Sequence, residues 1–599
     1  PRGLLLAGFS NQHRHPIAMS GSPPAHHLQF SVDEQPPHLL AAVLGFQIVT
    51  LILAGITLTP IIALKAAGAD PAAGNWVVFA ALLVSGLMTV LQARPIGVFG
   101  AGYVLFMGTS GAFIAVSIGA LKAGGLPLLG TLIVASSLIQ FVFARFLGFF
   151  RKIITPTVGG TVITLIAVSV MPIAFGMLTQ VPAEYAGAPE APVWSAGVTL
   201  ALILLISFYG TTKLRLWGPV IGVAAGYLVA YGLGLVDLTD AREASMVGLP
   251  SAPWPGLDLA FGTTFWTMLP GFMIVTIIGA LETYGDGLAI QEVSHREQRP
   301  PDFKSVQGAV NADGLGNLLS GLMGTLPNTT YSTSISVTEL TGVASRRVGV
   351  YGGVILTLLA LSPKVSAFLQ SIPGPVAGAF IFFLITLLFV HGIRLIISDG
   401  MSFDSGVIFG ISLWAGIGFQ SQQVFRALMP DTLAQLLDNG MTTGGIVAVV
   451  LSFLVSLKQS KSYSTTVPST IDSLPQVIAF GTQRGQALGW RSADLSRLQL
   501  ALEESFLYQI ENAQMSADFN TRIMLRGNEQ RLELEIVSAP GNSNLKSLIA
   551  DMEPVPDFSD DDLRLRILKN IADDISHQQF NNADYLSVII RSGAITRAG

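Results

Sequence analysis

The chain contains no cysteine and little charge for its length. The absence of cysteine among 599 residues excludes disulfide bridges and thiolate metal sites. Only 12% of the residues are charged, whereas 50% are hydrophobic and the mean hydropathy is +0.58. A soluble protein of this size needs a charged surface, so the composition indicates a chain solvated mainly by lipid. The net charge of -5 gives no indication of nucleic-acid binding.

The few charges are unevenly distributed along the chain. Of the 71 Asp, Glu, Lys and Arg residues, 32 lie after position 457, in the last quarter of the sequence. The first 30 residues lack a long apolar stretch and do not resemble a signal peptide. We therefore expect a disordered segment over 1–37, a membrane domain over 38–457, a linker over 458–474 and a soluble α/β domain over 475–599.

Apolar segments long enough to cross a bilayer recur through the membrane domain, and a spanning helix needs about 20 such residues. We predict about fourteen of them, at 39–64, 76–92, 98–121, 126–148, 156–178, 194–211, 217–236, 264–289, 305–325, 327–343, 349–370, 374–397, 403–420 and 440–457. The sequence thus predicts an α-helical polytopic membrane protein.

The loops between these segments alternate in charge. With the N-terminus in the cytoplasm, the cytoplasmic loops carry the basic residues Arg94, Arg145, Arg151, Lys152, Lys213, Arg215, Arg296, Arg299, Lys304, Arg346, Arg347, Arg394, Lys458 and Lys461. The opposite loops carry the acids Glu184, Glu190, Asp237, Asp240, Glu243, Asp431 and Asp438. The positive-inside rule therefore predicts an inner-membrane protein with both termini in the cytoplasm.

Two segments do not read as ordinary helices. The stretch 100–112 is rich in Gly and aromatic residues, and 327–336 is rich in Thr and Ser. Non-helical backbone is tolerated at membrane depth only where protein or a hydrated site satisfies it. These are the third and tenth spans, seven apart, as an inverted repeat of seven plus seven spans requires, although Gly and Pro are common enough here for chance spacing.

Ionisable side chains within apolar segments are candidates for function because lipid penalises them. Glu282 and Asp286 are four residues apart and share one helical face. Such a pair can bind and release a proton, and a carboxylate can accept two hydrogen bonds from N–H donors of a planar ligand. Alternatively, Asp286 is merely solvated at the helix end.

Two further ionisable residues allow a functional and a structural interpretation. Asp313 opens the ninth span and either caps that helix or takes part in function. His391 is the single histidine within a predicted span, and local packing is favoured over a role as a proton relay.

An ordered set of motifs then resembles the nucleobase–ascorbate transporter (xanthine/uracil permease) family. The set consists of Glu282-Thr-Tyr-Gly-Asp286, Ala312 to Gly324, Asn328-Thr-Thr-Tyr-Ser332 and Leu340 to Gly349. The resemblance covers about residues 38–457. It implies fourteen spans in a 7+7 inverted repeat, a core and a gate subdomain, short strands in spans three and ten, and a homodimer.

The resemblance also implies site residues and a transport mechanism. It places substrate binding at Glu282, Thr333, Ser334, Phe106 and Gln47, and coupling or structural roles at Asp286, Asp313, Asn328 and Thr341. The implied activity is symport of a nucleobase with H⁺ or Na⁺, with no other cofactor and no metal site.

The sequence departs from the family pattern at the site. The family has an acid or amide followed by Asn where this chain has Thr333 and Ser334, and Gln-His where it has Gln47-Ile48. A changed substrate or a uniporter is therefore open, as is an anion transporter of the same fold, although Glu282 would repel an anion. A third reading is a membrane sensor with a kinase-like tail.

The C-terminal segment resembles the GHKL-like ATPase domain of anti-sigma-factor kinases in degraded form. A helix over Leu498–Ala513, strands over 521–525, 531–538 and 585–591, and a second helix over Asp562–Asp574 are expected. Glu504 is retained, but the Mg²⁺-binding Asn is replaced by Tyr508, and the glycine-rich loops are degraded at 538–542 and 563–566. We predict a regulatory pseudo-ATPase that binds an anti-sigma-antagonist-like protein.

Overall fold

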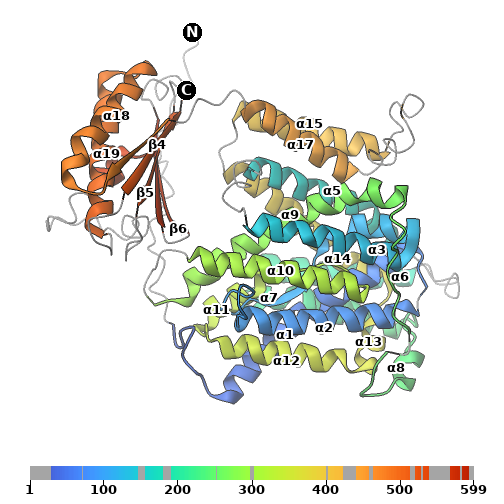
Figure 1. The fold of residues 1–599 in the computed structure, drawn as a ribbon. Helices are drawn as coiled ribbons and strands as arrows, with labels where there is room; N and C mark the ends of the chain where they lie inside the picture. The colour runs from blue at the N-terminus through green and yellow to red at the C-terminus, as the bar shows by residue number, and fades with distance from the viewer. Residues whose placement is uncertain are drawn as a thin grey trace, which may run out of the picture.

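The fold is that of a computed structural model, which describes residues 28–70, 72–145, 155–179, 190–250, 252–296, 302–398, 402–421, 429, 437, 440–456, 463–512, 520–527, 531–538, 567–580 and 583–591. A helical bundle and a smaller α/β domain make up this part of the chain (Figure 1).

The bundle contains two three-residue strands among its helices. Its elements are α1 (His38–Ala67), α2 (Ala73–Ala93), β1 (Met107–Thr109), the 3-10 turn η1 (Gly111–Phe113), α3 (Ile114–Arg145), α5 (Pro156–Leu178), α6 (Glu190–Tyr209), α7 (Thr212–Gly232), α8 (Thr239–Glu243), α9 (Thr263–Ser294), α10 (Phe303–Met323), β2 (Asn328–Thr330), α11 (Thr333–Thr341), α12 (Arg346–Ala360), α13 (Pro363–Gln370), α14 (Gly374–Ser398), α15 (Phe403–Ser421) and α17 (Gly440–Ser456).

Eight helices within the described residues are long and apolar enough to cross a membrane, namely α1, α2, α3 with η1, α5, α6, α7, α9 and α14. Among the predicted segments that do not meet this test, α10 and α15 are unbroken helices of 21 and 19 residues that are not apolar enough, and others are broken or shorter. The segment 349–370 is divided into α12 and α13 by a bend of 82°, and 327–343 is a strand followed by a nine-residue helix. The chain is thus a multi-pass helical membrane protein with several interrupted segments.

The turn between the third and fourth predicted segments lies inside α3. Gly124 and Gly125 have non-helical backbone angles there, and Gly125 has a φ of 67°. Because a side chain disfavours positive φ, glycine permits this break, and Pro127 follows it.

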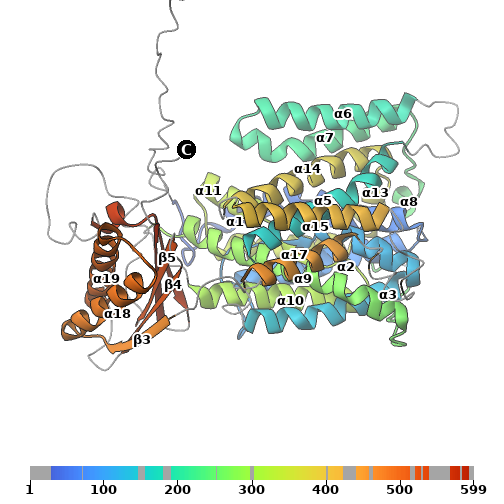
Figure 2. The ribbon, with the colours of Figure 1, turned by 90° about the horizontal axis from the view of Figure 1, so that it is seen from above.

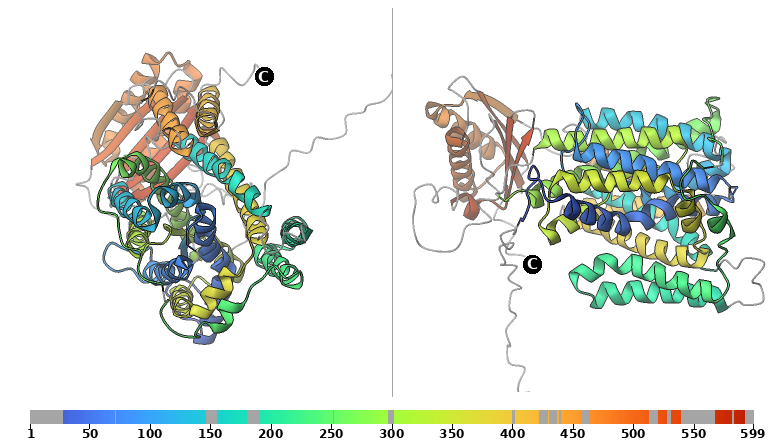
Figure 3. Two further views of the ribbon diagram at one scale, coloured as in Figure 1. Left: turned by 90° about the vertical axis from the view of Figure 1, so that its right-hand side faces the viewer. Right: turned by 90° about the horizontal axis from the view of Figure 1, so that it is seen from below.

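The helices pack in two groups, which are seen end-on in the left panel of Figure 3. In one group α1, α2, α3, α9, α10 and α12 surround the two strands, and in the other α5, α6, α14, α15 and α17 pack on one another. Glycine allows the closest approaches. A Cβ on Gly160 of α5 would meet the backbone of Gly392 on α14, and one on Gly86 of α2 would meet that of Gly353 on α12.

The N-terminal segment differs from the prediction over its last ten residues. Residues 1–27 lie outside the described part, but 28–37 form an extended segment against the loop before α12, and Phe30 forms a β-bridge with Val343. Leu28 and Val32 bury their side chains there, which accounts for the order of this stretch. The prediction of disorder over 28–37 was therefore wrong.

The C-terminal domain is a five-stranded antiparallel sheet with helices packed against it (Figure 2). Its elements are β3 (Tyr463–Pro468), the 3-10 turn η4 (Ile471–Ser473), α18 (Leu474–Ala487), α19 (Ser492–Asn512), β4 (Asn520–Gly527), β5 (Arg531–Ser538), β6 (Asp574–Phe580) and β7 (Ala583–Arg591), and the strand order is β3-β4-β5-β7-β6. The domain lies at one end of the bundle, with β6 beside α10.

Two predictions about this domain were wrong in their boundaries. The sequence predicts a linker over 458–474, but β3 lies within this stretch and pairs with β4 at the sheet edge. Its composition of Ser, Thr and Pro hid a run of β-branched residues. The helix expected over Asp562–Asp574 covers 567–571 in the described residues, and β6 begins at Asp574. The helix α19 and the strands β4, β5 and β7 confirm the other helix and the three strands predicted for this domain.

Candidate functional site

The two short strands pair with each other at the centre of the first helix group. They are antiparallel, with Met107 opposite Thr330 and Thr109 opposite Asn328, and all six residues are buried. The flanking backbone is also paired, because the Tyr331 N–H donates to the Phe106 carbonyl at 2.8 Å. The two interrupted segments thus satisfy each other's backbone, as membrane depth requires.

A helix begins immediately after each strand. The turn η1 starts two residues after β1 and leads into α3, and α11 starts three residues after β2. The N-terminal end of a helix carries a partial positive charge and unpaired N–H groups. Two such ends at the strand pair can attract an electron-rich group of a ligand.

The carboxylate of Asp286 on α9 is held by the segment that follows β2. The hydroxyls of Thr330 and Ser332 each donate to one of its oxygens at 2.7 Å. The Asp286 residue is 7% exposed. Asp286 is therefore a buried, hydrogen-bonded member of the site, and the alternative of a solvated carboxylate at the helix end was wrong.

Glu282 lies one helical turn before Asp286 and is half-buried. Among the described residues it has neither a hydrogen-bond nor an ion-pair partner. The helix α9 that carries it contacts both η1 and α11. A half-buried carboxylate without a partner on such a helix has its acceptor capacity available for a ligand.

Asp313 lies in the middle of α10, ten residues after the first residue of that helix. The N-cap is Asp302, whose side chain accepts a hydrogen bond from the Lys304 N–H. The interpretation of Asp313 as a cap is therefore wrong, because α10 begins at Phe303 and is capped by Asp302. Asp313 is fully buried and accepts a hydrogen bond of 2.5 Å from Gln140 Nε2 of α3.

A chain of amide side chains connects Asp313 to the start of β2. Gln140 accepts a hydrogen bond from Asn317 Nδ2, and Asn317 Oδ1 accepts one from the backbone N–H of Asn328. Asn328 Nδ2 in turn donates to Ser85 Oγ on α2. Through Asn328, the network connects α2, α3 and α10 to the strand pair.

Ser334 and Thr333 lie in the first turn of α11. The hydroxyl of Ser334 donates to the Tyr331 carbonyl at 2.7 Å and is 3.4 Å from the Phe106 N–H, which donates to it. Ser334 is fully buried, so it stabilises the turn between β2 and α11. Thr333 is half-buried and opens the helix beside the strand pair.

Three other predicted residues lie apart from the carboxylates. The ring of Phe106 is fully buried and packs where a side chain on Gly352 would lie, so it does not line an open site as expected of a substrate contact. Thr341 ends α11, and its hydroxyl donates to the Val337 carbonyl. Gln47 is half-buried on α1, with no hydrogen bond to the site in the described part of the chain.

Thr283, on α9 between the two carboxylates, lies with its hydroxyl 3.3 Å from that of Thr330. The sequence did not identify several hydroxyl and amide residues of the site, namely Gln140, Thr283, Asn317, Thr330 and Ser332. Thr330 and Ser332 belong to a motif that was recognised, and their position after a short strand is the signal that could have identified them. Gln140 carries no such signal, because a lone amide in an apolar segment has no defined direction before the packing is known.

His391 on α14 differs from its prediction. Its side chain is exposed and has no hydrogen-bond partner among the described residues. The described residues contain no group of three or more His, Asp or Glu side chains that could hold a metal ion.

Comparison with known proteins identifies the family. The sequence model of a permease family, named for xanthine and uracil permeases, matches residues 40–425. The xanthine permease XanP of Escherichia coli (strain K12) is 30% identical over 470 residues, covering 75% of this chain and 99% of its own length. The uric acid permease PucK of Bacillus subtilis (strain 168) is 27% identical over 434 residues, covering 72% and 99%.

Solved structures also match this chain at low identity. The transmembrane domain of a cyanobacterial bicarbonate transporter, BicA, is 16% identical with a TM-score of 0.45, covering 71% of this chain and all of its own. The matched family region ends before the C-terminal domain, which therefore lies outside it. The family model matches residues 40–425, and the match to XanP covers 99% of that permease. We conclude that this chain is a membrane transporter, not an enzyme, and belongs to the xanthine/uracil permease family.

Proposed function

We propose that the protein is a secondary active transporter of a nucleobase, with an oxopurine such as xanthine or uric acid as the substrate class. The observation that carries the proposal is the Glu282 carboxylate, which is half-buried and unpaired among the described residues and lies on α9, the helix that contacts both η1 and α11. The names of the relatives support a purine in particular, because they include permeases of xanthine and of uric acid.

The chemistry of the site suits such a ligand. A carboxylate has two oxygens that accept hydrogen bonds, and an oxopurine presents several ring N–H donors. Its carbonyl oxygens carry partial negative charge and are suited to the N-terminal ends of α3 and α11. Thr333 has a shorter reach than the acid or amide of related sites, so it would contact the base through its hydroxyl or through a water.

The proposed transport unit has about fourteen spans in a 7+7 inverted repeat. The helices around the strand pair would form the core subdomain, and the group containing α5 and α14 the gate subdomain. We further propose a homodimer in the inner membrane with both termini in the cytoplasm, supported by the charges of the loops.

Proton or sodium coupling is proposed to involve Asp286 and Asp313. Both are buried, and both reach the strand pair through hydroxyl or amide side chains. A change of charge at either residue would therefore alter the electrostatic potential where the substrate binds. Substrate uptake that rises with an inward proton gradient and stops with a protonophore would support H⁺, whereas a requirement for Na⁺ would support sodium.

The C-terminal domain is proposed to be a regulatory pseudo-ATPase of the GHKL-like type. Its helices α18 and α19 against an antiparallel sheet are compatible with this class. Tyr508, at the position that the resemblance assigns to the Mg²⁺-binding Asn, is buried. An anti-sigma-antagonist-like protein is the proposed partner. A pull-down with the full chain tests that contact, and binding of ATP would contradict the pseudo-ATPase.

The central experiment measures ligand-dependent thermal stability of the purified full chain against purines, pyrimidines and small anions. Binding at 100 times Kd stabilises by about 2.7 kcal/mol. The variant Glu282→Gln should weaken purine binding about 10- to 150-fold, because a hydrogen bond to a charged group contributes about 1.5–3 kcal/mol. Glu292→Gln is the matched control, since Glu292 is an exposed glutamate on the same helix.

Stabilisation by a purine that is lost in Glu282→Gln and kept in Glu292→Gln would support the proposal. Stabilisation by an anion alone, unchanged or increased in Glu282→Gln, would contradict it and favour an anion transporter.

A further inference from the structure

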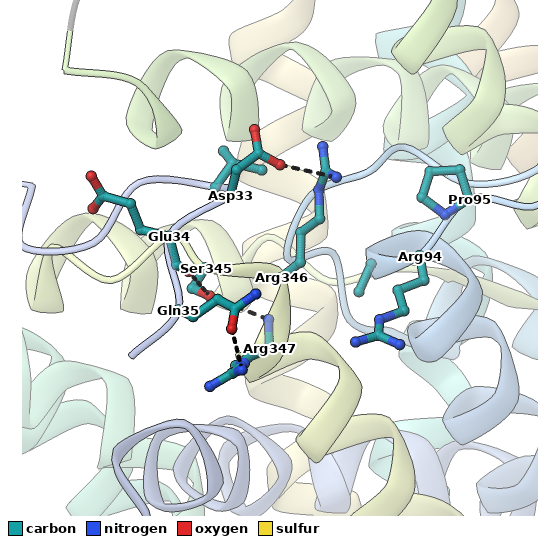
Figure 4. Close-up of a pocket in the computed structure, with 10 residues that line it drawn as sticks. Asp33, Glu34, Gln35, Arg94, Pro95, Ser345, Arg346 and Arg347 are labelled. Atoms are coloured by element: carbon teal, nitrogen blue, oxygen red, sulfur yellow. Dashed lines mark hydrogen bonds and ion pairs between the residues drawn. The ribbon is translucent and has the colours of Figure 1, made fainter. Parts of the chain in front are cut away.

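A second cavity lies away from the strand pair, between the N-terminal segment, the end of α2 and the start of α12 (Figure 4). Its volume is about 400 Å³. Three arginines, Arg94, Arg346 and Arg347, line it together with Asp33 and Glu34. The bundle therefore carries a basic pocket at the end where α2 terminates and α12 begins.

The acids of the pocket leave two of these arginines without a carboxylate partner in the described structure. Asp33 forms an ion pair of 3.1 Å with Arg346, and the Glu34 carboxylate forms one of 2.6 Å with Arg296, which does not line the pocket. Arg347 donates to neutral groups, the Gln35 side chain and the Pro36 carbonyl.

Arg94 is exposed and has no ion-pair or hydrogen-bond partner among the described side chains. In Figure 4 its guanidinium extends toward the side of Arg347, and no dashed line reaches it. The positive charges of Arg94 and Arg347 are thus uncompensated at one cavity. Two guanidinium groups can together bind the oxygens of a phosphate.

The N-terminal end of α12 does not supply donors to this cavity. The Arg346 N–H donates to the Val32 carbonyl, and the Arg347 N–H is 3.4 Å from the Ser345 hydroxyl, to which it donates. An anion bound here would therefore be recognised by the arginine side chains.

The loop beside Arg94 exposes apolar side chains. Ile96 is 71% exposed and Val98 is 65% exposed. Two hydrogen bonds between Ile96 and Phe99 close this tight turn, in which Gly97 has a φ of 63°. Such a turn next to a basic pocket at a helix end is suited to the boundary between lipid headgroups and acyl chains.

We propose that Arg94, Arg346 and Arg347 form a binding site for the phosphodiester headgroup of an anionic membrane lipid, with Ile96 and Val98 in contact with its acyl chains. Basic pockets between helices at a membrane surface are suited to such headgroups. The exposed turn favours a lipid over a free phosphate, because a soluble anion would gain nothing from Ile96 and Val98. The site is separate from the strand pair and does not depend on the proposed substrate.

The test uses the purified full chain in neutral detergent, titrated with phosphatidylglycerol or with phosphatidylcholine of the same acyl chains. Binding is measured by native mass spectrometry and by thermal shift. Phosphatidylglycerol should bind more tightly than phosphatidylcholine. Arg94→Gln should weaken the binding of phosphatidylglycerol about fivefold, the change that corresponds to about 1 kcal/mol per basic residue. Arg94→Gln combined with Arg347→Gln should weaken it about 25-fold by the same measure.

Two sets of variants test the place of the site and its contacts with the acyl chains. Arg215→Gln, at an exposed arginine at the start of α7 outside the pocket, should leave binding unchanged. The double variant Ile96→Ser and Val98→Ser should weaken the binding of phosphatidylglycerol and leave the binding of inorganic phosphate unchanged.

Three outcomes would overturn the proposal. The first is equal binding of both lipids to the unaltered chain. The second is that phosphatidylglycerol binds equally tightly to Arg94→Gln, to the double arginine variant and to the unaltered chain. The third is inorganic phosphate binding as tightly as phosphatidylglycerol, which would assign the pocket to a soluble anion.

Discussion

The hydrogen bond between Thr330 and Asp286 allows the charge of the carboxylate to be tested. Thr330 is 1% exposed and donates to Asp286 Oδ2 at 2.7 Å. Replacing it by valine keeps the shape of the side chain and removes the donor. A hydrogen bond to a charged group contributes about 1.5–3 kcal/mol, against about 0.5–1.5 kcal/mol for a neutral one.

We therefore expect Thr330→Val to lower the free energy of unfolding by about 1.5–3 kcal/mol if Asp286 is ionised. In an Asp286→Asn background the same change should cost only about 0.5–1.5 kcal/mol. Thr330→Ser keeps the hydroxyl, so in the unaltered chain it should lower the free energy of unfolding by less than Thr330→Val does. The measurement is SDS titration in mixed micelles, followed by circular dichroism.

Two results would refute this reasoning. An equal cost of Thr330→Val in both backgrounds would mean that Asp286 is not charged in the folded protein. No cost in either background would mean that the hydrogen bond contributes nothing to stability.

Three further predictions concern the site and the N-terminal segment. Gly108→Ala should lower the free energy of unfolding by about 1–3 kcal/mol and reduce transport, because its Cβ would overlap the Tyr331 ring. Gly197→Ala on α6, whose Cβ would meet no atom, serves as the control in an uptake assay. Gln140→Met should lower the free energy of unfolding by about 1–3 kcal/mol, because Asp313 Oδ2 would lose its hydrogen-bond donor. SDS titration measures this change, and an unchanged stability would contradict a stabilising role of the network. The Arg296 side chain, by hydrogen bonding, holds the pKa of Glu34 below its ordinary value of 4.5. The pair should therefore stabilise the N-terminal segment above pH 4.5 and lose this effect as the pH falls through the lowered pKa. Limited proteolysis should then show faster cleavage there at low pH, and Glu34→Gln should remove the pH dependence.

Much of the architecture could be predicted because long apolar segments and glycine breaks are local properties. The third and tenth segments were predicted to be non-helical from Gly, Thr and Ser content, and the strands β1 and β2 confirm it. The sequence could not show that these strands pair with each other. More than 200 residues separate Met107 from Thr330, and only the packing of α1, α2, α9 and α10 brings them together.

The boundaries were less predictable where local composition and tertiary contact disagree. The stretch 463–468 reads as a linker in isolation but forms a sheet edge because β4 provides its hydrogen-bond partners. Residues 28–37 likewise lack apolar runs, yet Arg296, Ser345 and Arg347 hold them in place.

The sequence by itself determined the membrane class, the family motifs and Glu282 as the principal candidate, because hydropathy and a rare carboxylate within an apolar segment need no neighbours to be recognised. Tertiary structure decided which side chains accompany it. In the structure Thr330 and Ser332 donate hydrogen bonds to Asp286, and Asp313 belongs to a buried hydrogen-bond network and does not cap a helix. The Phe106 ring packs against Gly352 of α12. The physical reason is that a polar side chain in a membrane protein takes its role from the donor or acceptor it meets, and the partners of these residues lie on other helices.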